Sequence, residues 1–210
     1  MMMARPTPTP LWFAAALIPM VGSQIVRLQQ SDPAAWIVWD YAGRLGVLAV
    51  LCAIPAARKI AFRFEPLRIA RWEVTIWIVG IVLVDHYWGG WIRRTINGAL
   101  PATVLGAYPE VQGWLHVLDI FFGLGLVALS EEILFRRCAH HLLKSYLDDG
   151  YALVLATSCM FGAFHWWTGF GNIGGAVVTG GLLMTLYGRS GALWPAVFGH
   201  YLADVVNFAP

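Results

Sequence analysis

Long apolar stretches separated by short polar ones follow one another along the whole chain. Most of them approach the length of a helix that crosses a bilayer, roughly 20 residues. We expect helical spans at residues 11–28, 34–57, 72–92, 114–137, 151–167, 173–188 and 191–208. The last three are short for a complete crossing, which indicates tilted, broken or partly interfacial helices. The pattern predicts an all-α fold, a polytopic transmembrane bundle of about seven helices.

Composition supports a membrane protein. Of the 210 residues, 59% are hydrophobic and only 12% are charged, whereas about 25% of residues are charged in soluble domains. The net charge of +2 is too small to indicate a nucleic-acid partner. Cys52, Cys138 and Cys159 lie in or beside apolar segments without paired spacing, which favours neither a disulfide framework nor a zinc knuckle. We expect one integral membrane domain over residues 1–210.

Basic residues predict the orientation of the bundle. The segment after the second span carries five of them within residues 58–71, against the single acidic Glu65. By the positive-inside rule this segment faces the cytoplasm, and the N-terminus then lies on the same side. Arg93 and Arg94 fall on the opposite side and depart from the pattern. We expect a protein of the cytoplasmic membrane, and the short single-domain form favours a prokaryotic source.

Ionisable residues interrupt the apolar spans at three places. The first is the segment Ser130–Arg136, in which Glu131 and Glu132 stand side by side. On a helix, Glu132 and Arg136 are four residues apart and share one face, which suits an ion pair. Glu131 is rotated by about 100° from Glu132, so it is expected to remain free to act on water or substrate. The alternative is a charge cluster that caps the end of the span.

Two histidines mark the other places. His165 follows Phe161 by four residues, and His200 precedes Asp204 by four, so each pair is expected to share a helical face. A carboxylate beside His200 could orient its imidazole. The alternatives are structural: His165 could bond to a backbone carbonyl or lie at the interface, and His200 could tie the last helix to its neighbours. An ionisable group inside a membrane more commonly marks function.

Together these groups resemble a hydrolytic centre. A glutamate and a histidine can activate a water molecule as general base, and a second histidine can stabilise the oxyanion that forms at a carbonyl. The same residues could instead bind zinc and a metal-activated water. The residues alone leave both mechanisms open.

The series Glu-Glu-x-x-x-Arg, Phe-x-x-x-His and His-x-x-x-Asp, in this order on successive spans, is similar to the CPBP family. This family comprises the type II CAAX prenyl endopeptidases and the bacterial Abi-type intramembrane proteases. The resemblance covers about residues 114–208. It implies a protease core in residues 111–210, with the catalytic cavity among the last four helices, and leaves residues 1–110 as helices without a motif.

The resemblance also implies roles for single residues. Glu131 would be the general base, with His165 as its partner, and His200 would stabilise the oxyanion. Glu132, Arg136 and Phe161 would support them. Asp204 departs from the eukaryotic pattern, which has asparagine there, because a carboxylate donates a hydrogen bond only when protonated. Asp204 is therefore expected to orient His200.

The implied function is an intramembrane endopeptidase that hydrolyses a peptide bond in a membrane-associated or lipid-anchored protein or peptide. We expect no metal and no other cofactor. The alternatives are a zinc-dependent intramembrane metalloprotease that uses the same residues as ligands, and a non-catalytic immunity or accessory protein. A proton-coupled transporter is disfavoured because neither inverted repeats nor additional helices are visible.

Further charges lie within the spans. Asp40 and Arg44 are four residues apart in the second span and predict a structural ion pair. The others are interpreted as contacts between helices or as the lining of a substrate path, namely Asp85, His86, His116 and Asp119. The cavity itself is expected to open towards the cytoplasmic side.

Overall fold

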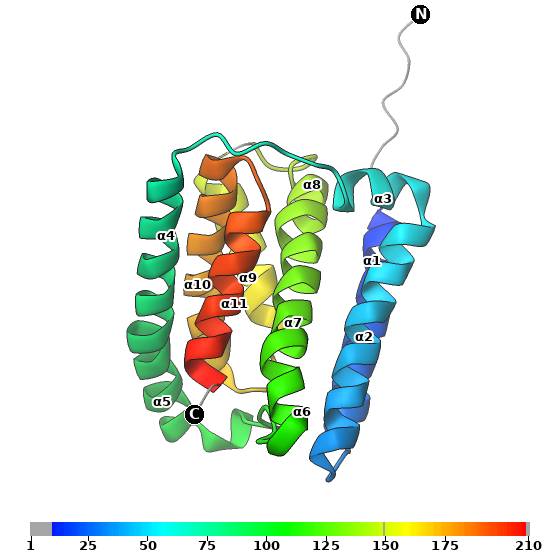
Figure 1. The fold of residues 1–210 in the computed structure, drawn as a ribbon, viewed down its shortest axis with the longest axis vertical. Coiled ribbons are helices and arrows are strands. Elements are labelled where there is room, and N and C mark those ends of the chain that lie inside the picture. Colours follow the sequence, from blue (N-terminus) through cyan, green and yellow to red (C-terminus); the bar gives the residue numbers. More distant parts are fainter. Residues whose placement is uncertain (1–9, 149, 209–210) are drawn as a thin grey trace, which may run out of the picture.

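The computed structural model describes residues 10–148 and 150–208, and helices form most of this part of the chain (Figure 1). The first helices are α1 (Pro10–Arg27), α2 (Pro33–Ala53) and the short α3 (Pro55–Ala61). A continuous helical segment follows, formed by α4 (Arg71–Leu83), a π-helical segment (Val84–Gly89) and α5 (Gly90–Ala99). The second continuous segment contains α6 (Gly113–Leu118), α7 (Leu124–Glu132) and α8 (His140–Leu143), joined by π-helical segments at Asp119–Gly123 and Ile133–Ala139. The last helices are α9 (Tyr151–Phe164), α10 (Phe170–Ser190) and α11 (Trp194–Phe208).

Each expected span coincides with a helix or a continuous helical segment in the described residues, so the all-α bundle is confirmed. The largest differences in length concern two segments. The third span was expected to end at residue 92 but continues to Ala99, and the fourth was expected to end at residue 137 but continues to Leu143. The part added to the third span contains two arginines and an asparagine, the part added to the fourth contains two histidines, and neither contains a proline. A hydropathy pattern therefore finds where the apolar stretch stops, not where the helix stops.

Local signals explain several helix ends. The Asp32 side chain accepts hydrogen bonds from the backbone N–H groups of Ala34 and Ala35 and so caps α2. Pro55 ends α2 and opens α3, because proline has no N–H to continue the helical hydrogen bonds. Gly191 ends α10 in the left-handed conformation, with φ of 68°, which glycine adopts without strain.

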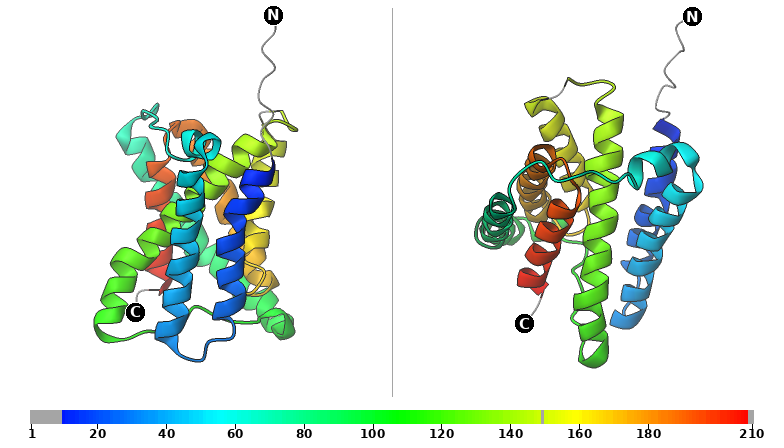
Figure 2. Two further views of the ribbon diagram at one scale, coloured as in Figure 1. Left: turned by 90° about the vertical axis from the view of Figure 1, so that its right-hand side faces the viewer. Right: turned by 45° about the horizontal axis from the view of Figure 1, so that its top comes forward.

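The helices form a bundle in which the first two stand apart from the others (Figures 1 and 2). Helix α1 packs along α2, and α2 contacts α7. Helix α9 packs on α10, which also contacts α5, and α11 contacts α4, α7 and α10. The continuous segment α6–α8 therefore lies between the α1–α2 pair and the remaining helices, and its middle is where Glu131 and Glu132 are placed.

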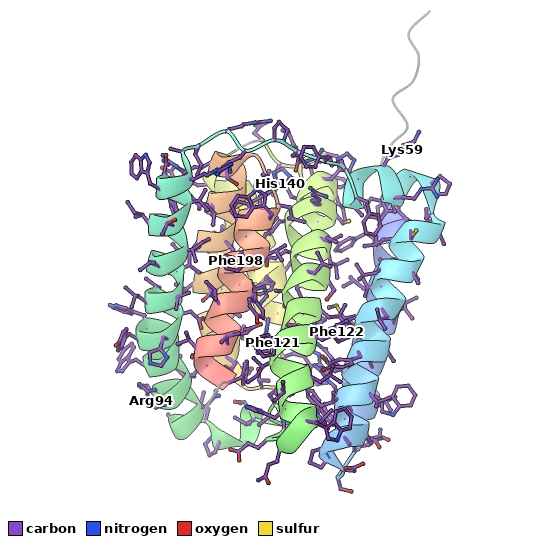
Figure 3. All side chains as sticks on the ribbon, in the orientation of Figure 1. Lys59, Arg94, Phe121, Phe122, His140 and Phe198 are labelled. Carbon is purple, nitrogen blue, oxygen red and sulfur yellow. The ribbon has the colours of Figure 1, made fainter. Side chains whose placement is uncertain are left out.

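The outer surface of the bundle is largely apolar. Phe121, Phe122 and Phe198 are about half exposed or more, as are many other large apolar side chains (Figure 3). Among the residues that the structure describes, four helical segments are long and apolar enough to cross a membrane, namely Pro10–Arg27, Pro33–Ala53, Arg71–Ala99 and Phe170–Ser190. Lipid tails are the natural surroundings for such a surface, and the chain is an integral membrane protein.

Candidate active site

A cavity of about 500 Å³ lies among the helices. Its deep wall is formed by buried polar groups, including Arg44, Glu131 and His200. At its other end the lining includes Val104 and Phe208, which are 39% and 46% exposed and so mark the mouth. Helices from both halves of the chain contribute to the lining, and those carrying all three motifs are among them.

The mouth lies at the end of the bundle opposite to the basic segment. The chain runs from the basic residues near Arg71 down α4 to α5, and the mouth is built from the loop that follows α5 and from the last turn of α11 (Figure 1). Lys59 and Arg94 mark the two ends (Figure 3). The expectation that the cavity opens on the side of the basic segment is therefore wrong. Hydropathy and charge place helix ends on either side of a membrane, but they carry no information on which end of a bundle is hollow.

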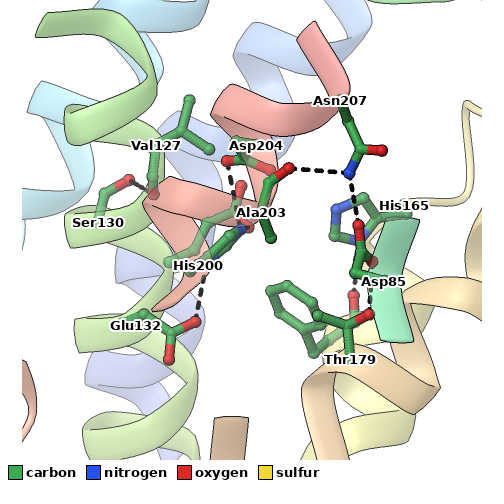
Figure 4. A network of polar contacts seen from close by, with 12 residues as sticks. Asp85, Val127, Ser130, Glu132, His165, Thr179, His200, Ala203, Asp204 and Asn207 are labelled. Carbon is green, nitrogen blue, oxygen red and sulfur yellow. Dashed lines mark hydrogen bonds and ion pairs between the residues drawn. The ribbon is translucent and has the colours of Figure 1, made fainter. Parts of the chain in front are cut away.

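The expected ion pair of the first motif is present and completely buried. Arg136 Nε lies 2.9 Å from Glu132 Oε2, and neither side chain is exposed. Glu132 Oε1 accepts a second hydrogen bond, from Nδ1 of His200 at 3.0 Å (Figure 4). Because a carboxylate only accepts, the His200 ring carries a proton on Nδ1. Glu132 thus ties the first motif to the third.

Glu131 is not free, contrary to the expectation from helical spacing. Its Oε1 accepts a hydrogen bond from Arg44 Nη1 at 2.8 Å, across 87 residues of sequence. Its Oε2 is buried without a hydrogen-bond partner among the described residues and lies 3.9 Å from His200 Nε2. Glu131 lines the cavity. One carboxylate oxygen is therefore fixed, and the other is left available.

His165 lies just beyond the end of α9, at its C-cap, and not within the helix as expected. Its Nδ1 is 2.9 Å from the backbone carbonyl of Phe161. A carbonyl oxygen only accepts, so the proton is on Nδ1 and the lone pair of Nε2 is free. The ring also lines the cavity. The structural alternative, a bond to a backbone carbonyl, therefore holds for Nδ1, and the functional role of Nε2 stays a prediction.

The Phe161 ring joins the motifs through its faces and edges. Its centroid is 4.9 Å from that of His165 and 5.7 Å from that of His200, both in edge-on arrangements. The guanidinium carbon of Arg136 lies 4.5 Å from the centroid of the same ring, close enough for a cation–π contact. Phe161 is therefore a packing residue common to all three motifs.

Asp204 approaches His200 without a well-formed hydrogen bond. Its Oδ2 is 3.5 Å from Nε2 of His200, and the same oxygen is buried with no hydrogen-bond partner among the described residues (Figure 4). The neighbouring polar group on α11, Asn207, instead bonds to Asp85 at 2.6 Å. Asp85 also accepts from Thr179 at 2.6 Å. These residues line the cavity together with Asp204, so the interpretation of Asp85 as part of a substrate path agrees with its place.

Two further expectations concern charges outside the motifs. Asp40 and Arg44 form the predicted ion pair, with Arg44 Nε 2.7 Å from Asp40 Oδ2. The pair extends to Glu131, which the sequence interpretation missed. Asp119 accepts hydrogen bonds from Tyr41 and Tyr108 and so connects helix α2 to the segment before α7, as expected of a contact between helices.

A metal ion would need several donors at one point. Within residues 10–148 and 150–208, no group of three or more His, Cys, Asp or Glu side chains is placed to hold one. The carboxylates of the first motif are already engaged: Glu132 binds Arg136 and His200, and Glu131 binds Arg44 through one oxygen.

Comparison with known proteins finds one family model that matches part of the chain. Residues 112–206 match the family model of the type II CAAX prenyl endopeptidases described as Rce1-like. No curated protein and no solved structure matches the chain. The matched segment contains all three motifs and much of the deep wall of the cavity, and it confirms the resemblance drawn from those motifs. Through residues 112–206, slightly less than half of its length, this chain is similar to the type II CAAX prenyl endopeptidases described as Rce1-like.

Proposed function

We propose that this protein is an intramembrane endopeptidase that uses Glu131, without a metal, to hydrolyse a peptide bond in a membrane-associated or lipid-anchored substrate. The observation that carries the proposal is the second oxygen of Glu131. It is buried without a hydrogen-bond partner among the described residues, and Glu131 is one of the residues that line the cavity. A buried carboxylate oxygen without a partner is energetically unfavourable, and such groups are retained where a ligand or water completes them.

In this mechanism Glu131 and His165 activate the water. Oε2 of Glu131 accepts a proton from a water molecule held at the wall of the cavity, and Nε2 of His165 accepts its second hydrogen bond. The fixed tautomer of His165 supports this role, because the bond from Nδ1 to the Phe161 carbonyl leaves Nε2 as the acceptor.

The attacked carbonyl would develop its negative charge beside His200. Carboxylate oxygens lie near both nitrogens of this ring, Glu132 at Nδ1 and Asp204 at Nε2, which suits a ring with a proton on each nitrogen. The Nε2–H group can then donate to the oxyanion. Asp204 would orient the ring, as its position 3.5 Å from Nε2 allows.

The position of the cavity mouth indicates from which side of the membrane a substrate would enter. We place the basic end of the bundle in the cytoplasm, because the five basic residues between positions 58 and 71 gather there. The mouth at Val104 and Phe208 then faces the opposite side of the membrane. Substrate would reach Glu131 from that side or from within the bilayer.

The proposal is tested with purified protein in lipid nanodiscs and a prenylated peptide that ends in the Cys-aliphatic-aliphatic-X pattern. Release of the C-terminal fragment is followed by mass spectrometry. Glu131→Gln keeps an acceptor for Arg44 but removes the base, and it should lower kcat by at least about 100-fold. The matched control is Glu110→Gln, in an exposed loop, which should cleave at the wild-type rate.

Cleavage by Glu131→Gln at the rate of the wild type would refute the mechanism. Each protein is also assayed with and without a chelator. Activity that disappears with chelator and returns with zinc would replace the metal-free mechanism by a metal-dependent one. Binding of the peptide by the wild-type protein without any cleavage would favour the non-catalytic accessory role.

A further inference from the structure

The two helices that precede the matched family segment reach directly into the candidate site. Helices α1 and α2 lie wholly before residue 112, where the family match begins. Nevertheless, Arg44 from the middle of α2 contacts Glu131 and lines the cavity. We propose that Arg44 is a positioning residue for Glu131, held in place by a chain of buried charges from α1 and α2. This inference rests on the proposed role of Glu131 as the base.

Arg44 is placed to orient one oxygen of the carboxylate and leave the other. Its Nη1 donates to Glu131 Oε1 at 2.8 Å, and the same nitrogen lies 3.3 Å from the hydroxyl of Ser130. Its Nε donates to Asp40 Oδ2 at 2.7 Å. A guanidinium is planar and its donors point in fixed directions, so a guanidinium held at both points fixes the carboxylate rotation. Oε2 of Glu131 is consequently turned away from Arg44.

Asp40 is in turn anchored from α1. Its Oδ1 accepts from Nη1 of Arg27, which is itself buried. The guanidinium of Arg27 lies against two indole rings, 4.3 Å from the centroid of Trp36 and 4.5 Å from that of Trp167. These stacked contacts favour a planar cation and restrict its movement. The anchor of the chain is therefore rigid.

The four side chains alternate in charge from α1 to the site. Arg27, Asp40, Arg44 and Glu131 carry two positive and two negative charges, and all are buried. A buried ion pair that loses one partner is destabilised because a charge is left uncompensated. The chain of four is neutral as a whole, and Glu131 therefore retains its charge without a partner on Oε2.

Helix α1 supports the opposite side of the site as well. The side chain of Gln24 donates to the carbonyl of Phe164 at 3.2 Å and accepts from the indole N–H of Trp166 at 2.9 Å. These two residues flank His165. The same helix pair thus braces the glutamate and the histidine that are proposed to share a water, and the distance between them depends on residues outside the family motifs.

The test compares three variants for kcat and KM in the peptide cleavage assay. Arg44→Lys keeps the charge but cannot contact Asp40 and Glu131 together, and Arg44→Met removes both contacts. The matched control is Arg94→Met, since Arg94 is exposed on α5. We expect kcat to fall by about 100-fold for Arg44→Met, and by a smaller factor for Arg44→Lys, with KM unchanged within about twofold. The control should retain the wild-type kcat.

The outcomes separate this inference from the proposed function. If Glu131→Gln is inactive but both Arg44 variants keep the wild-type kcat, Arg44 has no positioning role while the base assignment stands. If Glu131→Gln is active, the proposed function fails first. A loss in Arg44→Lys that appears in KM alone would also overturn the inference. Should Arg44→Met not fold, as judged by size-exclusion chromatography, Arg44→Lys carries the test by the same criterion.

Discussion

The fully buried pair of Arg136 and Glu132 allows a quantitative prediction, because the chain contains a matched pair at its surface. Arg136 and Glu132 approach to 2.9 Å with both side chains completely buried. Arg189 and Glu73 also approach to 2.9 Å, but their side chains are 58% and 24% exposed. The two pairs share residue types and distance and differ in burial. Removing the arginine from each therefore isolates the effect of the surroundings.

The expected effects differ severalfold. Arg136→Met leaves the buried Glu132 carboxylate without its arginine partner and should lower the free energy of unfolding by about 3–5 kcal/mol. At about 2–4 °C per kcal/mol for a chain of this length, the midpoint should fall by about 10 °C. Arg189→Met removes a solvent-screened pair and should change stability by less than about 1 kcal/mol. Thermal unfolding of both variants in one detergent, followed by intrinsic tryptophan fluorescence, measures the difference.

A double variant tests the cause. Glu132→Gln combined with Arg136→Met also removes the carboxylate charge that has lost its arginine, while the amide oxygen introduced by the first substitution can still accept from Nδ1 of His200. This double variant should recover more than half of the decrease in the thermal unfolding midpoint. Equal shifts for the single variants at the buried and exposed pairs would refute the argument from burial. No recovery in the double variant would show that packing against Phe161, not charge, accounts for the loss.

Two further predictions concern helix packing and orientation. Gly162→Ala should lower the free energy of unfolding by about 1–3 kcal/mol, because a Cβ there would overlap the Val177 side chain of α10. The control is Gly125→Ala, where an added Cβ has nothing within 4 Å, so this variant should be neutral or slightly stabilising. Thermal unfolding of both variants measures the difference. In a cysteine-free background, Val104→Cys at the mouth should react with a membrane-impermeant maleimide from outside intact cells, and Phe64→Cys in the basic segment should react only after lysis. Labelling in the reverse order would invert the proposed orientation.

The parts of the site that the sequence predicts are those set by local geometry. Glu132 and Arg136 are four residues apart on one helix, so their pairing follows from the helical repeat alone. The same rule finds Asp40 and Arg44. The succession of apolar stretches likewise predicts the helices and their order. Such inferences need no knowledge of which helices are neighbours.

The parts of the site that the sequence does not predict depend on how segments far apart in the chain pack together. The bond from Arg44 to Glu131 joins α2 to α7 across 87 residues, and no spacing rule relates the two. The sequence nevertheless contains a signal. Asp40 and Arg44 lie in the middle of an apolar span, where charged side chains are energetically costly and commonly mark a functional site. The position of His165 was also missed. A four-residue spacing cannot show that α9 ends at Phe164 and leaves the ring at its C-cap.

The two adjacent glutamates show how identical side chains acquire different tasks in one helix. Both are buried, and they differ by about 100° in direction, which places them before different neighbours. Glu132 contacts Arg136 and His200, so both of its oxygens are bound. Glu131 lines the cavity and contacts Arg44 through one oxygen, while its other oxygen has no hydrogen-bond partner within the described part of the chain. A carboxylate with both oxygens engaged can orient its neighbours but cannot readily take a proton from water. The proposed role of Glu131 as the base therefore follows from its one unbonded oxygen, which Glu132 lacks. The residue that binds its other oxygen, Arg44, comes from α2, a helix outside the family motifs.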